Sequence, residues 1–347
     1  MKKPGPSGKR HKRVTISQVA EEAGVARATA AFVISGRAEQ LRISQQTIKR
    51  VQAVAKRLGY VPNQLARGMI TGRTQVVGVI LGGVWGKFGQ YAIEGIREVL
   101  DAEGYTPFLT IHSWDEAREA REIDTLLRMR VDGVIVMPQI TSRKDCYEPL
   151  VKQQVPVVFF GDVPFDIPGA LVAAWDVRPA LRLLLEHLAG RGCRRIGLVG
   201  ERYFKFSRER YQVFKKTIRA LGLTHDPKWD IWAEVGDPEH PEWGQAIVAM
   251  PDRPDAIVAL NDNSGLQMLG SLRRHGLRVP EDIRIAALGD TIETVEASAQ
   301  LTAIREPVRE IGRAAATLVL EAIRDPALPP TERLVDTAEL IVRMSTC

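Results

Sequence analysis

Residues 15–36 read TISQVAEEAGVARATAAFVISG, and this stretch decides the fold of the first part of the chain. Thr15 and Gln18 have the spacing of a capping box, in which each side chain accepts a hydrogen bond from a backbone N–H at the start of a helix. Gly24 can adopt the left-handed conformation on which helices commonly end, so the predicted helix is short. The small residues after Arg27 predict a second helix that packs closely against the first. Two helices joined by a turn that contains glycine form a helix-turn-helix.

A third helix is predicted after a loop at residues 37–43. Ser44 can cap its start and Gly59 follows its last turn. Between them, apolar residues recur at helical spacing, namely Ile48, Val51, Ala55 and Leu58. Because three such helices can bury one small core, residues 14–62 are expected to form an all-α helix-turn-helix domain.

The positive charge of the chain is concentrated in its first 75 residues. They contain 15 Lys and Arg against 3 Asp and Glu, a net charge of +12, whereas the whole chain has a net charge of +6 and the remainder is therefore at −6. Helical hairpins with a glycine turn have many functions, but a basic head beside an acidic body is typical of a protein that binds nucleic-acid phosphates. Residues 1–13 are expected to be a disordered basic tail.

A series of short motifs runs through the head and the segment after it: TISQVA at 15–20, AGV at 23–25, LGYVPN at 58–63, LAR at 65–67 and TGRT at 71–74. With these motifs the sequence resembles the LacI/GalR (lactose-repressor) family of transcriptional regulators, and the resemblance spans nearly the whole chain. It departs from the family in the second helix. Ala26 stands where relatives usually have Ser, and residues 30–32, Ala-Ala-Phe, stand where they usually have Val-Ser-Arg.

The resemblance implies that the second helix enters the major groove of double-stranded operator DNA. We expect Arg27, Ala28 and Thr29 to reach base edges, and Thr15 and Ser17 to contact phosphates. Further expected DNA-binding residues are Arg42, Asn63, Leu65, Ala66 and Met69.

Residues 63–75 connect the head to the body. A helix this short is marginal alone, because its nucleation costs more than its few hydrogen bonds return, and Gly68 weakens it further. In the family the connector is a hinge helix that folds on DNA and inserts an apolar residue into the minor groove, and Met69 stands at that position. The alternative is a plain linker.

From residue 76 to 347 apolar strands alternate with amphipathic helices, which is typical of parallel α/β layers. The strand at residues 195–199 echoes the first strand at 76–81, so the pattern repeats. Two similar lobes imply a cleft between them at the carboxyl ends of the strands. The chain is expected to cross between the lobes near residues 163–174, 302–305 and 325–330.

The resemblance identifies this body as a type I periplasmic-binding-protein-like domain, which usually binds a sugar or another small metabolite, and we expect residues 76–347 to be the effector-binding and dimerisation domain. Arg210 matches an arginine that points into the cleft in the family, with a surface salt bridge as the alternative. Asn261 and Asp262 follow a buried strand, with a helix cap as the alternative. Gly161 and Gly289 stand where many relatives have Asp. The expected effector-binding residues are Phe88, Asp162, Trp175, Arg210, Asn261, Asp262 and Asp290, of which Phe88 and Trp175 could instead be core residues.

Other classes of protein are poorly supported. No dinucleotide-binding or phosphate-loop motif occurs and no His and carboxylate residues have metal-ligand spacing, so we expect no catalytic site, metal or cofactor. The cysteines, Cys146, Cys193 and Cys347, are too scattered for a disulfide framework and read as reduced thiols. No apolar run is long enough to cross a membrane, and the N-terminus lacks the apolar core of a signal peptide.

The sequence therefore predicts a cytoplasmic, nucleoid-associated transcriptional regulator, with repression favoured over activation, that responds to a small-molecule effector. A homodimer on a palindromic operator is expected, since one short recognition helix covers few bases. The chain ends soon after its last strand signal with no heptad tail, which favours a dimer over a tetramer. The alternative is a cytoplasmic sugar-binding sensor or sugar-modifying enzyme, which the basic head disfavours.

Overall fold

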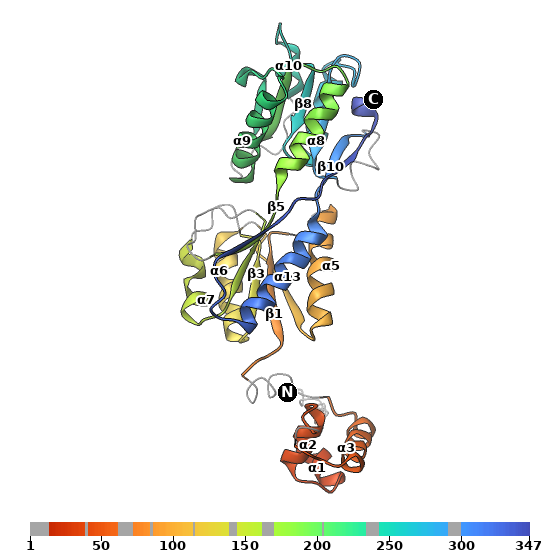
Figure 1. Cartoon of the computed structure of the whole chain (residues 1–347), viewed down its shortest axis with the longest axis vertical. Coiled ribbons are helices and arrows are strands. Elements are labelled where there is room, and N and C mark those ends of the chain that lie inside the picture. Colours follow the sequence, from red (N-terminus) through yellow and green to blue (C-terminus); the bar gives the residue numbers. More distant parts are fainter. Residues whose placement is uncertain are drawn as a thin grey trace, which may run out of the picture. The chain divides into compact units, whose positions relative to one another are not determined.

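The computed structural model describes residues 14–38, 41–61, 72–83, 86–113, 115–138, 144–161, 170–202, 205–233, 243–290 and 300–347. The chain divides into two compact units, Met1–Gln75 and Val76–Cys347 (Figure 1). The first unit is the helical head and the second is the α/β body. The expected fold class, a helix-turn-helix head followed by a two-lobed α/β domain, is confirmed.

The head contains helices α1 (Ile16–Glu22), α2 (Arg27–Ile34) and α3 (Gln45–Leu58). The predicted capping box is present, because the Thr15 N–H donates to Gln18 Oε1 at 2.8 Å and the Gln18 N–H donates to Thr15 Oγ1 at 3.4 Å. The Ser44 hydroxyl accepts from the Thr47 N–H at the start of α3. Local sequence signals thus set the helix ends.

The three helices enclose one small core. Its buried residues come from all three helices and from the loop before α3: Val19, Ala20, Ala23, Ala30, Val33, Ala38, Val51, Val54 and Ala55. Small side chains dominate the faces of α1 and α2, which lets the two short helices approach closely.

The body contains two six-stranded sheets. The first has the order β11-β5-β4-β3-β1-β2, formed by β1 (Val76–Leu81), β2 (Thr106–Ile111), β3 (Gly133–Val136), β4 (Val157–Phe160), β5 (Leu171–Trp175) and β11 (Thr331–Val335), and every pairing in it is parallel. The second has the order β12-β10-β9-β8-β6-β7, formed by β6 (Ile196–Glu201), β7 (Asp230–Ala233), β8 (Ala256–Ala259), β9 (Arg284–Leu288), β10 (Thr302–Arg305) and β12 (Glu339–Ile341). Only β12, at its edge, is antiparallel to its neighbour.

Helices cover both faces of each sheet, so each lobe has two apolar layers. In the first lobe these are α5 (Gly86–Ala102) and α13 (Val308–Arg324) on one face and α6 (Glu116–Arg128), η1 (Lys144–Tyr147) and α7 (Glu148–Lys152) on the other. In the second lobe they are α8 (Val177–Gly190) and α9 (Lys205–Ala220) on one face and α10 (Trp243–Val248) and α11 (Asp262–Arg274) on the other. Two short helices, η2 (Pro227–Trp229) and η3 (Met344–Thr346), complete the second lobe.

The chain crosses between the lobes after β5, after β10 and after β11. The crossing expected near 302–305 coincides with the end of β10. The expected segments 163–174 and 325–330 instead lie at or before β5 and β11, which both belong to the first sheet. For the segment 325–330 the difference has a physical reason: β11 is a sheet-edge strand whose residues alternate between exposed and partly buried, so it lacks the continuous apolar run of a central strand.

Helices α5 and α13 lie side by side along the first sheet (Figure 1, orange and blue). Gly95 of α5 faces the backbone of Arg309, and Gly312 of α13 faces the backbone of Ala92. Glu98 forms ion pairs with Arg309 and, at 2.7 Å, with Arg313. These two arginines hold the pKa of Glu98 below its usual value by hydrogen bonds. The glycines thus allow close packing of two helices whose ends reach the interlobe region.

Within the part of the chain that the structure describes, no helix is long and apolar enough to span a membrane.

Candidate functional site

The beginnings of α1 and α2 lie on the surface of the head. Arg27 and Ala28 are exposed at the start of α2, and Thr29 is partly buried. Thr15 and Ser17 at the start of α1 are exposed as well, although the Thr15 hydroxyl takes part in the capping box. Helix N-termini carry partial positive charge and attract phosphate groups, so these positions suit contact with a nucleic-acid backbone.

The loop before α3 carries Arg42, which is exposed and has a backbone φ of 54°. Four expected DNA-binding residues lie outside the described residues: Asn63, Leu65, Ala66 and Met69.

Helix α3 adds exposed basic side chains to the head. Lys49, Arg50, Lys56 and Arg57 are all exposed. Arg57 also forms an ion pair with Glu22 of α1, which joins the first and third helices. The resulting positive potential favours a polyanionic partner, whose counterions are released on binding.

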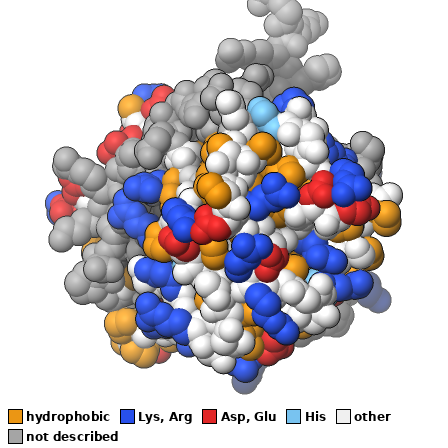
Figure 2. Space-filling model, turned by 90° about the horizontal axis from the view of Figure 1, so that it is seen from above, with side chains coloured by type: hydrophobic (Ala, Val, Ile, Leu, Met, Phe, Trp, Pro, Cys, Tyr) orange, Lys and Arg blue, Asp and Glu red, His pale blue; other side chains and the backbone are white. Residues whose placement is uncertain are grey.

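The body has a different charge distribution. In the view of Figure 2, basic and acidic side chains are interspersed, with apolar side chains between them. The excess of basic residues lies in residues 1–75, whose net charge is +12, whereas the remainder of the chain is at −6.

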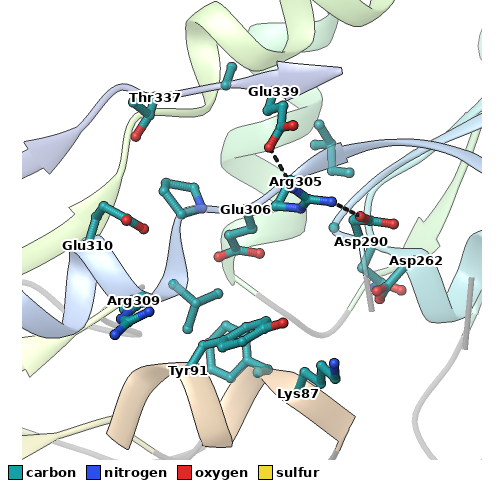
Figure 3. Close-up of a pocket in the computed structure, with 17 residues that line it drawn as sticks. Lys87, Tyr91, Asp262, Asp290, Arg305, Glu306, Arg309, Glu310, Thr337 and Glu339 are labelled. Carbon is teal, nitrogen blue, oxygen red and sulfur yellow. Dashed lines mark hydrogen bonds and ion pairs between the residues drawn. The ribbon is translucent and has the colours of Figure 1, made fainter. Parts of the chain in front are cut away.

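A cavity of about 860 Å³ lies between the two lobes of the body (Figure 3). This is within the range of small-molecule sites, roughly 300–1,000 Å³. Its lining comes from the start of α5, the start of α11, the end of β9, the crossing after β10 and the crossing after β11. The lining residues are Lys87, Phe88, Tyr91, Asn261, Asp262, Leu288, Gly289, Asp290, Arg305, Glu306, Pro307, Val308, Arg309, Glu310, Thr337, Ala338 and Glu339.

Asn261 lines the cavity, and its side chain is also the N-cap of α11. Its Oδ1 accepts a hydrogen bond from the Ser264 N–H at 2.8 Å, and its Nδ2 donates to Glu201 Oε2 at 2.6 Å. Glu201 is buried at the end of β6, where its other oxygen accepts from the Ser264 hydroxyl at 2.6 Å. Asn261 is therefore a helix cap, which was the alternative to a binding role, and the capping hydrogen bond holds the residue at the cavity wall.

Asp262 is the first residue of α11, where its carboxylate is favoured by the positive end of the helix dipole. It lies against Gly289, because a Cβ added at Gly289 would be 3.2 Å from Asp262 Cγ. The φ of Gly289 is +91°, a conformation that side-chain-bearing residues rarely adopt. The glycine at 289, where the resemblance suggests Asp, therefore leaves room for the carboxylate of Asp262.

Asp290 also borders the cavity, but protein groups hold its carboxylate. Its side chain is 3 % exposed, one oxygen lies 2.7 Å from Arg343 Nη1, and the other lies 3.2 Å from Arg305 Nη2. Figure 3 shows Arg305 between Asp290 and Glu339, the second carboxylate that it pairs with, at 2.7 Å. Asp290 thus orients Arg305 at the cavity edge.

Arg210, on α9, is buried beside the cavity and is not among its lining residues. Its Nη1 donates to the Leu260 carbonyl at 2.6 Å, and its Nη2 lies 3.8 Å from Glu306 Oε1. The guanidinium carbon lies 5.4 Å from the ring centre of Trp175. Arg210 therefore connects α9 with the end of β8 and with two interlobe crossings.

The two expected aromatic residues differ in position. Phe88 lines the cavity and packs edge-on against Phe160, with ring centres 6.0 Å apart. Trp175 is absent from the lining, and its indole N–H donates to the Thr337 carbonyl at 3.2 Å across two crossings. The remaining expected residue, Asp162, lies outside the described residues.

Sequence reasoning missed several polar residues of the cavity: Lys87, Tyr91, Arg305, Glu306, Arg309, Glu310 and Glu339. The sequence pattern could have indicated some of them, since residues 305–310 lie at and directly after the crossing expected near 302–305. Among the described residues, no group of three or more His, Cys, Asp or Glu side chains is placed to hold a metal ion.

Comparison with known proteins agrees with this arrangement. Residues 15–63 match the model of bacterial regulatory proteins of the lacI family, and residues 185–346 match a periplasmic binding protein-like domain. The HTH-type transcriptional repressor PurR of Aliivibrio salmonicida is 27% identical over 312 residues, which cover 90% of this chain and 92% of the relative.

Two solved structures extend the comparison. A complex of the transcriptional regulator CelR with cellobiose has a TM-score of 0.67 and 26% identity, and the match covers 96% of this chain and 100% of that chain. The lac repressor dimer bound to operator and an anti-inducer has a TM-score of 0.81 at 21% identity, covers 96% of this chain and 99% of that chain, and shows the shared fold. With its helix-turn-helix head and its two-lobed body, the chain belongs to the LacI family of bacterial regulatory proteins.

Proposed function

We propose that this protein is a transcriptional repressor that binds a palindromic operator as a homodimer and is controlled by a polar small molecule bound between the lobes of its body. The observation that carries the proposal is the combination of a basic helix-turn-helix head, with exposed helix starts, and a body with an interlobe cavity of about 860 Å³. The repressor PurR is a relative over nine-tenths of the chain, which supports repression.

The length of α2 supports a two-fold assembly. With eight residues from Arg27 to Ile34, one helix can reach the edges of only a few base pairs. Two heads related by two-fold symmetry would read two half-sites, which doubles the contacted sequence and requires a palindrome. Since its target is operator DNA, we place the protein in the cytoplasm, on the nucleoid.

The lining of the cavity supports a polyhydroxylated effector such as a sugar. Carboxylates accept hydrogen bonds from hydroxyl groups, and Asp262 and Glu306 approach from the second lobe and from a crossing. Phe88 and Tyr91 on α5 add aromatic faces on the side of the first lobe. The CelR structure, whose ligand is cellobiose, offers a precedent among relatives.

Because residues of both lobes line the cavity, a ligand that contacts both sides would draw the two lobes together. The effector would then act on the connector at residues 63–75, whose folding on DNA we propose as the bistable element. A coupling of roughly 1–3 kcal/mol would change DNA affinity about fivefold to a hundredfold.

A thermal-shift screen of the full chain against sugars and related metabolites tests the effector site. A true effector raises the unfolding temperature of the wild type, loses this effect in Asp262→Ala, and keeps it in the control Asp124→Ala, which removes an exposed carboxylate of α6 outside the cavity. The same compound should change affinity for a selected operator duplex. Equal shifts in both variants would contradict the assigned site.

A further inference from the structure

The side of α2 opposite the core carries three apolar side chains in its middle turns. Ala30 and Val33 are buried in the core of the head, and helical geometry places Ala28, Ala31 and Phe32 on the opposite side. Ala28 is exposed, and Ala31 and Phe32 are partly exposed. None of these three side chains can donate or accept a hydrogen bond.

Phe32 is not among the residues that form the core of the head. The core and the partly buried residues packed against it contain Val33 and Ile34 from this end of the helix, but not Phe32. Its carbonyl accepts from the Ser35 hydroxyl at 3.2 Å at the end of the helix, and its side chain is partly exposed. Single exposed apolar residues are ordinary, but here a ring adjoins two methyl groups on one face.

The charge around this face indicates its partner. The unit that contains α2 carries a net charge of +12, and Arg27 is exposed at the start of the same helix. A second protein surface would need acidic groups to match this potential, whereas duplex DNA supplies phosphates on both sides of a groove. Within the major groove, the group that an apolar side chain can recognise is the 5-methyl of thymine.

We propose that Ala28, Ala31 and Phe32 read the operator through apolar contacts with thymine methyl groups. This inference rests on the proposed function. It predicts that each half-site has thymines at positions beneath the middle of α2, and that hydrogen-bonded base recognition by α2 is left to Arg27 and Thr29.

The probe is a set of duplexes selected by the full chain from a random pool. Each conserved thymine of a half-site is replaced by deoxyuridine, which removes only the methyl group and leaves the base pair unchanged. At a contacted position we expect about fourfold weaker binding for each methyl lost, or about 16-fold when both half-sites are changed. Replacing the same T·A pair by C·G should weaken binding, and methylating that cytosine at C5 should restore part of the loss.

Protein variants identify the residue that contacts the methyl group. In Phe32→Ser, deoxyuridine should have little effect at the position that the ring contacts, while the salt-dependent affinity for random duplex remains. Ala28→Gln should shift the base selected at one position towards adenine, which a Gln amide can bind through two hydrogen bonds. The control Gln52→Ala, an exposed residue of α3, should keep the wild-type response to deoxyuridine.

The outcomes separate the two proposals. If the chain selects no sequence, the proposed function fails. If the chain selects a palindrome but deoxyuridine does not weaken binding at any conserved thymine, the proposed function stands and apolar readout is wrong. The same conclusion follows if Phe32→Ser responds to deoxyuridine as the wild type does at every conserved thymine.

Discussion

Replacement of Gly95 by Ala tests the packing of α5 against α13. An added Cβ would lie 2.0 Å from the Arg309 carbonyl oxygen and 2.9 Å from its carbon. Both are backbone atoms, so no side-chain rotation can relieve the overlap. Since non-bonded atoms attract best near 3.5 Å, the helices would have to separate by roughly 1 Å or more.

The cost follows from two opposing terms. Overpacking costs about 1–3 kcal/mol and sometimes more, and separation would also stretch the ion pairs of Glu98 with Arg309 and Arg313. The higher helix propensity of Ala returns up to about 1 kcal/mol. We expect a net loss of about 2 kcal/mol, equivalent to a decrease in unfolding temperature of roughly 3–4 °C for the unit Val76–Cys347.

The matched control is Gly190→Ala. Gly190 is the last residue of α8, and an added Cβ there has no neighbour within 4 Å. Thermal unfolding of the full chain, followed by circular dichroism, should show no decrease for Gly190→Ala and the stated decrease for Gly95→Ala. Equal unfolding temperatures in the two variants would refute the close approach of α5 and α13.

Three further predictions concern the head, the cavity region and the pH dependence of stability. Arg27→Ala should relax base preference in a duplex selection, and a variant that lost only salt-dependent affinity would make Arg27 a phosphate contact. Arg210→Ala should lower the free energy of unfolding of the ligand-free protein by about 1–3 kcal/mol in urea titrations, because the substitution removes a buried hydrogen bond. If the variant kept its stability but lost effector binding, Arg210 would instead contact the ligand directly. Burial lowers the pKa of His225, but the Asp230 carboxylate, 3.5 Å from Nε2, and the hydrogen bond of Nδ1 with the Ile196 carbonyl outweigh burial and raise the pKa above its ordinary value of 6.5. The protonated imidazole therefore contributes stability that is complete below pH 6.5 and is lost as the pH rises through the folded-state pKa. The difference in the free energy of unfolding between wild type and His225→Gln should consequently shrink with rising pH, and a constant difference would contradict this reasoning.

The fold of the head could be predicted because its signals are local. The capping box of Thr15 and Gln18 acts within one helical turn, and Gly59 adopts the left-handed conformation at the end of α3 with a φ of 64°. Such features depend little on the rest of the chain. The contribution of Ala38 to the core was missed, because a loop residue has no helical periodicity to reveal its burial.

The cavity was predictable only in outline. The sequence places Asn261 and Asp262 after a strand, but whether a side chain caps a helix or faces a ligand depends on tertiary geometry, and Asn261 both caps α11 and lines the cavity. Asp290 meets Arg343 from a segment far away in sequence. Arg210 likewise meets Glu306 across a crossing, and no local pattern encodes these pairs.

The central claim is sequence-specific DNA binding by the basic head. Its most direct test is the affinity of the full chain for a selected palindromic duplex and for a scrambled duplex of the same length and composition, measured at several salt concentrations. We expect the palindrome to bind at least roughly 10³-fold more tightly, with both affinities falling linearly in log–log plots against salt. Equal affinity for the two duplexes at every salt concentration would contradict the claim.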